Sequence, residues 1–154
     1  MKTKIKIISL SFSIVLLGFL REYLFGNINW IYLTLINKRA NQARKEFYYL
    51  LEWTPNEILI YKWILTFIFL GLFCLITYLI IRIQFQNKIY SKAVILVFAG
   101  LLASSGLFYT IGVVFSVQNE IYPIVRTLMG LGQSFMPLMF LFILFKFFPT
   151  SKID

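Results

Sequence analysis

Three stretches of the chain are apolar over a length typical of membrane-spanning helices. They cover residues 58–81, 93–117 and 128–145, and Lys62 is the one charged residue among them. A helix needs about 20 mainly apolar residues to cross the hydrocarbon core of a bilayer. The composition agrees, because 60% of the 154 residues are hydrophobic and 14% are charged, against about 25% charged in soluble domains. We therefore expect the bilayer to be the solvent of this chain.

Four spans are expected, which predicts an all-α integral membrane protein built as a four-transmembrane-helix bundle. The last apolar stretch extends toward the N-terminus, which places three spans at about 58–81, 93–117 and 122–146. A first span at about 5–25 needs an argument, because lysines before an apolar run resemble the start of a signal peptide. No small-x-small cleavage site follows that run, so we interpret the segment as an uncleaved membrane helix.

Residues 30–52 form the one long segment between spans, and apolar side chains recur in it at steps of three and four. That spacing predicts a single helix with one apolar face, and basic and amide side chains occupy much of the remainder. A basic amphipathic helix beside membrane spans is typical of a segment in the headgroup plane. A docking surface for a partner is the alternative. The apolar positions are Leu33, Ile36, Ala40, Ala43, Phe47 and Leu50.

The basic residues favour an orientation with both chain ends in the cytoplasm, across the inner membrane of a bacterium. With four spans, eight Lys and Arg residues fall on the side of the N-terminus and seven on the other. The preference is small, and the amphipathic segment contributes four of the seven. The first group is Lys2, Lys4, Lys6, Arg82, Lys88, Lys92, Lys146 and Lys152, and the second is Arg21, Lys38, Arg39, Arg44, Lys45, Lys62 and Arg126.

Charged residues near the ends of spans are candidates for function, because charge is costly near hydrocarbon. Arg21 and Glu22 end the first span. Glu57 begins the second span and Arg126 lies near the start of the fourth, so all four residues fall on one side of the bilayer. Arg126 has three interpretations: an interfacial anchor, an internal ion pair with Glu22 or Glu57, or a site for a ligand or partner.

Gln133 and Ser134 are polar residues inside the fourth span, close to Gly130, Gly132 and Pro137. Small residues let two helices approach closely, and an embedded glutamine hydrogen-bonds across such a contact. Helix packing is therefore one interpretation of this group. A polar notch is the other, because Pro137 leaves a backbone carbonyl without its helical partner.

Several functional classes lack the residues that they need. The chain has no histidine and one cysteine, Cys74, which excludes His-based triads, His or multi-Cys metal sites and an internal disulfide. The six acidic residues form no paired motif and none lies in mid-span, which argues against an enzyme and a proton carrier. The net charge of +9 lies mostly at the edges of apolar runs, as in membrane anchors, so no nucleic-acid partner is expected. We expect no catalytic residue, cofactor or metal, and Cys74 as an apolar filler.

Two short stretches carry a resemblance to a known group of proteins. They are Arg21-Glu22-x-Leu24-Phe25 at the end of the first span, and Arg126 with Gly130, Gln133-Ser134 and Pro137 in the last. These stretches, about twenty residues in all, resemble small hydrophobic proteins of Bacteroidota-type bacteria that accompany exosortases, the membrane enzymes of a protein-sorting system. The double Arg of one such group is missing here, and so is the His that the sorting enzymes use. The resemblance implies an accessory subunit rather than the enzyme.

The sequence thus predicts a non-enzymatic accessory membrane protein that packs against a membrane-protein partner, which the resemblance assigns to a protein-sorting system. Its partner-facing parts would be the amphipathic segment and residues 126–137. A small homo-oligomeric transporter or channel is the alternative. An enzyme that acts on a lipid or an anchored peptide through Glu22, Glu57 and Arg126 is a third hypothesis. The candidate functional cluster is Arg21, Glu22, Glu57, Arg126, Gln133 and Ser134.

Overall fold

The computed structural model describes residues 2–37 and 40–148, with every side chain in these ranges except those of residues 2, 3 and 119. Over these ranges the chain is helical and has no strand. Lys38, Arg39 and Lys152, which the orientation count includes, lie outside the described residues. The elements in chain order are α1 (Lys2–Asn37), the 3-10 helix η1 (Lys45–Glu52), α2 (Pro55–Phe85), α3 (Lys88–Val114), α4 (Gln118–Gly132) and α5 (Met136–Phe147).

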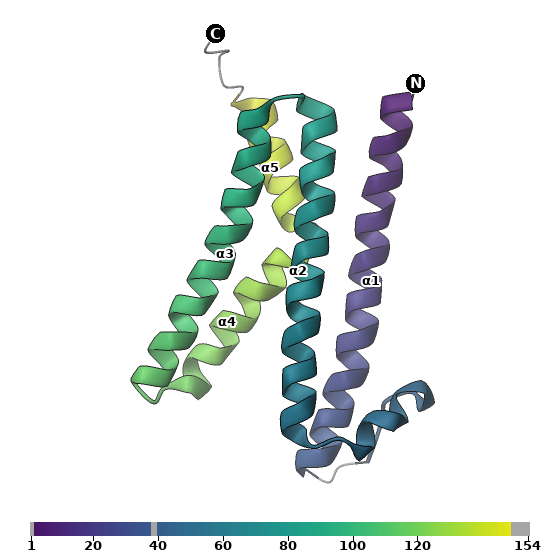
Figure 1. Cartoon of the computed structure of the whole chain (residues 1–154), viewed down its shortest axis with the longest axis vertical. Coiled ribbons are helices and arrows are strands. Elements are labelled where there is room, and N and C mark those ends of the chain that lie inside the picture. The colour runs from purple at the N-terminus through teal and green to yellow at the C-terminus, as the bar shows by residue number, and fades with distance from the viewer. Residues whose placement is uncertain (1, 38–39, 149–154) are drawn as a thin grey trace.

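The helices form a bundle around α2, which packs against α1, α3, α4 and α5 (Figure 1). The turn between α2 and α3 lies at the same end of the bundle as the start of α1 and the end of α5. The 3-10 helix η1 lies at the opposite end and packs against α1. From the far end of α3, α4 returns along α3, and α5 continues toward the α2–α3 turn.

Three helices, α1, α2 and α3, are long and apolar enough to cross a membrane, and the pair α4–α5 adds a fourth if it counts as one bent span. The prediction of a helical chain with several membrane-length helices is confirmed. Helix α2 contains the whole predicted span 58–81. It begins earlier, at Pro55, because Thr54 and Glu57 form a capping box there. Helix α3 begins at Lys88 rather than 93 and ends at Val114 rather than 117.

The prediction of one amphipathic helix over 30–52 is wrong. Residues 30–37 belong to α1, residues 40–44 are not helical, and η1 covers Lys45–Glu52. Nothing interrupts α1 near 25, because Ile28 and Ile31 are fully buried in a cluster that includes residues of η1 and α2. Phe47 and Leu50, the buried residues of η1, are three residues apart, which matches the three residues per turn of a 3-10 helix.

The predicted span 122–146 is not one continuous helix, because α4 and α5 meet at an angle of 61°. Pro137 lies in the first turn of α5 and lacks the N–H that a continuous helix would use. The Ser134 hydroxyl donates to the Leu131 oxygen at 2.8 Å and accepts from the Met136 N–H at 3.2 Å. These local bonds form a turn that competes with the helix. The helix α4 also begins before 122, at Gln118.

The apolar core lies in the half of the bundle nearer the α2–α3 turn. Phe73 is fully buried there, and Leu141 and Phe145 of α5 belong to the same cluster. The rings of Tyr90 and Phe145 stack with their centroids 4.3 Å apart, which joins α3 to α5. The interior of this half of the molecule is packed with large apolar side chains, so a buried polar network has to be sought in the other half.

Candidate functional site

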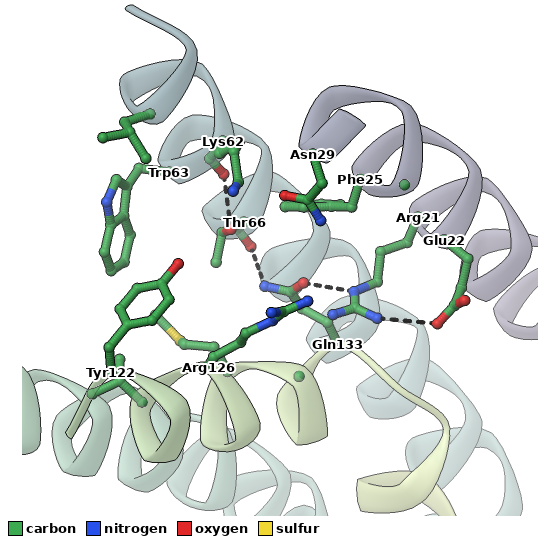
Figure 2. A pocket seen from close by; sticks show the side chains of 15 residues that line it. Arg21, Glu22, Phe25, Asn29, Lys62, Trp63, Thr66, Tyr122, Arg126 and Gln133 are labelled. Carbon is green, nitrogen blue, oxygen red and sulfur yellow. Dashed lines mark hydrogen bonds and ion pairs between the residues drawn. The ribbon is translucent and has the colours of Figure 1, made fainter. Parts of the chain in front are cut away.

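A cavity of about 290 Å³ lies between α1, α2 and α4, close to the break between α4 and α5 (Figure 2). Helices α1 and α4 both pack against α2, and Arg21 of α1 reaches Gln133 beyond the end of α4. The lining combines charged groups with aromatic rings. The charged residues are Arg21, Glu22, Lys62 and Arg126, and the rings are those of Phe25, Trp63 and Tyr122.

Gln133 is the centre of a hydrogen-bond network that joins three helices, and it is only 3% exposed. Its Oε1 accepts from Nε of Arg21 at 2.9 Å, and its Nε2 donates to the main-chain oxygen of Thr66 at 3.0 Å. Gln133 follows the last residue of α4, and its side chain points toward α2 (Figure 2). Both ends of the amide are satisfied, as a buried amide requires.

The cavity holds more positive than negative charge. Arg21 Nη1 lies 3.7 Å from Glu22 Oε1, and the Glu22 side chain is 78% exposed. Arg126 forms no ion pair with any residue that the structure describes, and its charge repels those of Arg21 and Lys62. Lys62 lies over the ring of Tyr32, with Nζ 5.1 Å from the ring centroid. Among the described lining residues, three cations therefore face one carboxylate, that of Glu22, which is itself largely exposed.

Four of the six residues predicted as a functional cluster line this cavity: Arg21, Glu22, Arg126 and Gln133. Glu57 and Ser134 do not. The Glu57 carboxylate accepts from the Thr54 N–H at 2.7 Å and from its hydroxyl at 2.9 Å, so it caps α2. Ser134 forms the turn between α4 and α5. Within the described residues Arg126 is paired with neither Glu22 nor Glu57, so the internal ion pair is not formed.

Lys62, Thr66 and Asn29 line the cavity and are missing from the predicted cluster. A signal for them exists in the helical spacing. Lys62 and Thr66 are four residues apart on α2, and the Thr66 hydroxyl donates to the Lys62 oxygen at 2.8 Å. Asn29 lies eight residues after Arg21, two steps of four along the same face of α1.

Uncharged stretches indicate how deep the cavity would lie in a bilayer. On α2 residues 63–81 are uncharged, about 28 Å of helix, close to the roughly 30 Å of a hydrocarbon core. Thr66 is four residues past Lys62, about 6 Å inside the edge that Lys62 marks. On α1 residues 7–20 are uncharged, about 21 Å, which leaves Arg21 about 9 Å short of the far edge. With the charged residues at the edges of the hydrocarbon core, both helices would put the network inside it.

Comparisons with protein-family models, with curated proteins and with solved structures find no match for this chain. In the part of the chain that the structure describes, no three Cys, Asp or Glu residues gather to hold a metal ion. The described lining has three cations and one largely exposed carboxylate, a set of charges suited to holding an anionic group.

Proposed function

We propose that this chain is a non-enzymatic accessory subunit of a membrane assembly, and that its cavity receives an acidic group of a membrane partner. The observation that carries the proposal is the charge imbalance: Arg21, Lys62 and Arg126 line the cavity, and Glu22 is the one carboxylate among its described lining residues. An unpaired cation near hydrocarbon has a high desolvation free energy. An anion from outside the chain would lower that free energy, and this supplies most of its binding energy.

Depth and access favour a carboxylate on a partner's membrane helix over a lipid phosphate. Lipid phosphates lie in the headgroup layer, whereas the uncharged stretches of α1 and α2 support a depth of about 6–9 Å inside the hydrocarbon for the Arg21–Gln133 bond. Tyr122 and Arg126 of α4 and Glu22 of α1 are exposed at the margin of the cavity. A spanning helix seated between α1 and α4 brings an Asp or Glu to Arg126 at the right depth.

The identity of the partner and the orientation of the chain rest on two other observations. The resemblance to exosortase-associated proteins suggests that the partner belongs to a protein-sorting system. We infer an inner-membrane protein with both chain ends in the cytoplasm, which basic residues at that end of the bundle support. They are Lys4, Lys6, Arg82, Lys88, Lys92 and Lys146.

Photo-crosslinking in native membranes tests the proposal, with a photoreactive amino acid in place of Tyr122 at the cavity margin. We expect an adduct with a spanning helix that carries an Asp or Glu near the linked residue, identified by mass spectrometry. Arg126→Gln should abolish the adduct. Lys45→Gln, which removes an exposed charge on η1, should leave it intact. An adduct that survives Arg126→Gln, or that joins only two copies of this chain, contradicts the proposal.

The homo-oligomeric transporter or channel is a second candidate, and the break between α4 and α5 is the observation that favours it. Broken helices that line a cavity at membrane depth recur in transporters, where their free backbone groups hold the substrate. This function requires self-assembly and a flux in liposomes that Arg126→Ala abolishes. A monomer that passes no ion would rule it out.

A further inference from the structure

A second basic hollow, of about 480 Å³, lies at the turn between α2 and α3. Gln86 makes this turn in the left-handed conformation, with φ of 53°. Asn87 caps α3, because its Oδ1 accepts from the Ile89 N–H at 2.8 Å. Figure 1 shows the turn at the end of the bundle where α1 begins. The hollow is therefore separate from the cavity at Gln133, which lies farther along α2 toward η1.

Among the residues that the structure describes, three cations line this hollow and no carboxylate does. Arg82 belongs to the last turn of α2, and Lys88 and Lys92 belong to the first two turns of α3. The two lysines are four residues apart on one helix, where like charges repel. They also lie at the positive end of the α3 dipole, and the first turn of α3 has no acidic residue. The two lysines therefore repel each other and the positive end of the helix dipole, and an anion in the hollow would offset this repulsion.

The remaining lining residues suit an anion with a chain attached. Arg82 lies over the ring of Tyr78, with Cζ 5.9 Å from the centroid, which holds the guanidinium at the rim of the hollow. Ser91 is buried, and its hydroxyl donates to the Asn87 oxygen at 3.4 Å. Ile95 lines the hollow one turn below Ser91 and is 53% exposed, so an apolar wall continues down α3. A ligand with a charged head and a hydrocarbon tail would match this order of cations and then apolar surface along the hollow.

The depth of the hollow identifies the source of the anion. The uncharged stretch of α2 ends at Arg82, so Arg82 marks an edge of the hydrocarbon core, next to the layer of lipid phosphates. We infer that the hollow binds the phosphate of an anionic phospholipid, with Arg82, Lys88 and Lys92 as its charged contacts and Ile95 beside the acyl chain. Basic pockets at the ends of membrane helices bind phospholipid headgroups by the same chemistry.

Native mass spectrometry of the full chain tests this assignment, after reconstitution in phosphatidylcholine with a minor fraction of phosphatidylglycerol. We expect a retained phosphatidylglycerol adduct. The double variant Lys88→Gln, Lys92→Gln should lower its occupancy roughly tenfold. The matched control Lys4→Gln, Lys6→Gln removes two charges at the same end of the bundle but outside the hollow, and should keep the adduct. Arginine at positions 88 and 92 should restore it.

The other outcomes overturn the assignment. Equal loss in the two glutamine variants shows general attraction between a basic end and an acidic surface. An unchanged adduct in Lys88→Gln, Lys92→Gln shows that the lipid is held elsewhere. Binding of inorganic phosphate that displaces the lipid identifies the ligand as a free phosphate instead. Circular dichroism and a single elution peak establish that each variant is folded before the spectra are compared.

Discussion

The core around Phe73 and the cavity beside Gln133 share the central helix α2, but different interactions hold their neighbours to it. Around Phe73, large apolar side chains of α2, α3 and α5 interlock. At Gln133, α1 and α4 are linked to α2 through two hydrogen bonds, from Arg21 and to Thr66, and a cavity remains beside them. One region is closed by apolar packing, and the other keeps a cavity beside a polar network.

This difference has a physical lesson for a protein whose solvent is lipid. Helices in a bilayer gain little from the hydrophobic effect, because lipid tails are as apolar as Leu or Phe side chains. Packing and interhelical hydrogen bonds then contribute on a similar scale, and a small polar network can position a helix as firmly as an aromatic core. The core can therefore be rigid while the cavity stays available for a partner.

Phe73→Ala should have the largest effect on the stability of the folded bundle. Only the lost packing counts in a bilayer, so we expect a loss of about 2 kcal/mol, below the roughly 3–5 kcal/mol of a soluble core. Steric trapping or SDS unfolding measures it. Phe140→Ala is the control, because Phe140 is 62% exposed and should change little. A loss in the full soluble range would show that burial from water, and not packing, drives this contact.

Gln133→Met should come next, with a loss of about 1.5 kcal/mol. Methionine keeps the volume of the side chain but gives up the bonds to Arg21 and Thr66. Spin labels on α1 and α4 should also report a broader distance distribution. Gln84→Met, at an exposed site on α2, is the control. If stability and distances stay unchanged, the network does not position α1.

Gly132→Ala tests how closely α4 approaches α2 beside the cavity. A Cβ at this position would lie 2.6 Å from Leu70 Cδ1, so Leu70 must move. We expect a loss of about 1 kcal/mol by overpacking. Gly71→Ala has nothing within 4 Å of the added Cβ and should gain a few tenths of a kcal/mol from helix propensity, about 0.5 at most. A neutral Gly132→Ala would mean that the Leu70 side chain moves aside without cost.

Arg126→Gln should have the smallest effect on stability and a different sign. It removes repulsion with Arg21 and Lys62, so the free energy of unfolding should stay the same or rise by about 0.5 kcal/mol. The same variant should lose the partner in the crosslinking assay. Loss of function with unchanged or greater stability is typical of binding residues. A clear loss of stability would instead assign Arg126 to the fold.

The sequence predicts the membrane helices well, because length and apolarity follow directly from the bilayer. Pro137 and Ser134 are conspicuous in the sequence, but the 61° bend depends on local hydrogen bonds that no periodicity reveals. The spacing of apolar residues after 30 predicts a separate helix. Residues 30–37 continue α1 instead, because tertiary contacts of Ile28 and Ile31 override the expected boundary.

The candidate site was predicted only in part, for a reason of geometry. Arg21, Glu22 and Arg126 are conspicuous charges at span ends, and Gln133 is a polar residue in an apolar run. Which of them meet depends on how each helix is rotated about its axis, which single-chain periodicity does not fix when a helix is apolar all round. Glu57 is a charge at a span end that does not reach the site, because a local capping box determines its position.

The first half of α1 lies mostly outside the bundle, and Figure 1 shows it leaning away from α2 toward its start. Ile14 is the one buried residue between 7 and 20, with Leu17 packed beside it. Selection can act on the positions that face neither the bundle nor a partner helix almost only through their affinity for lipid. Over many generations these positions should drift freely among Leu, Ile, Val and Phe, while residues 21–31 of the same helix change slowly.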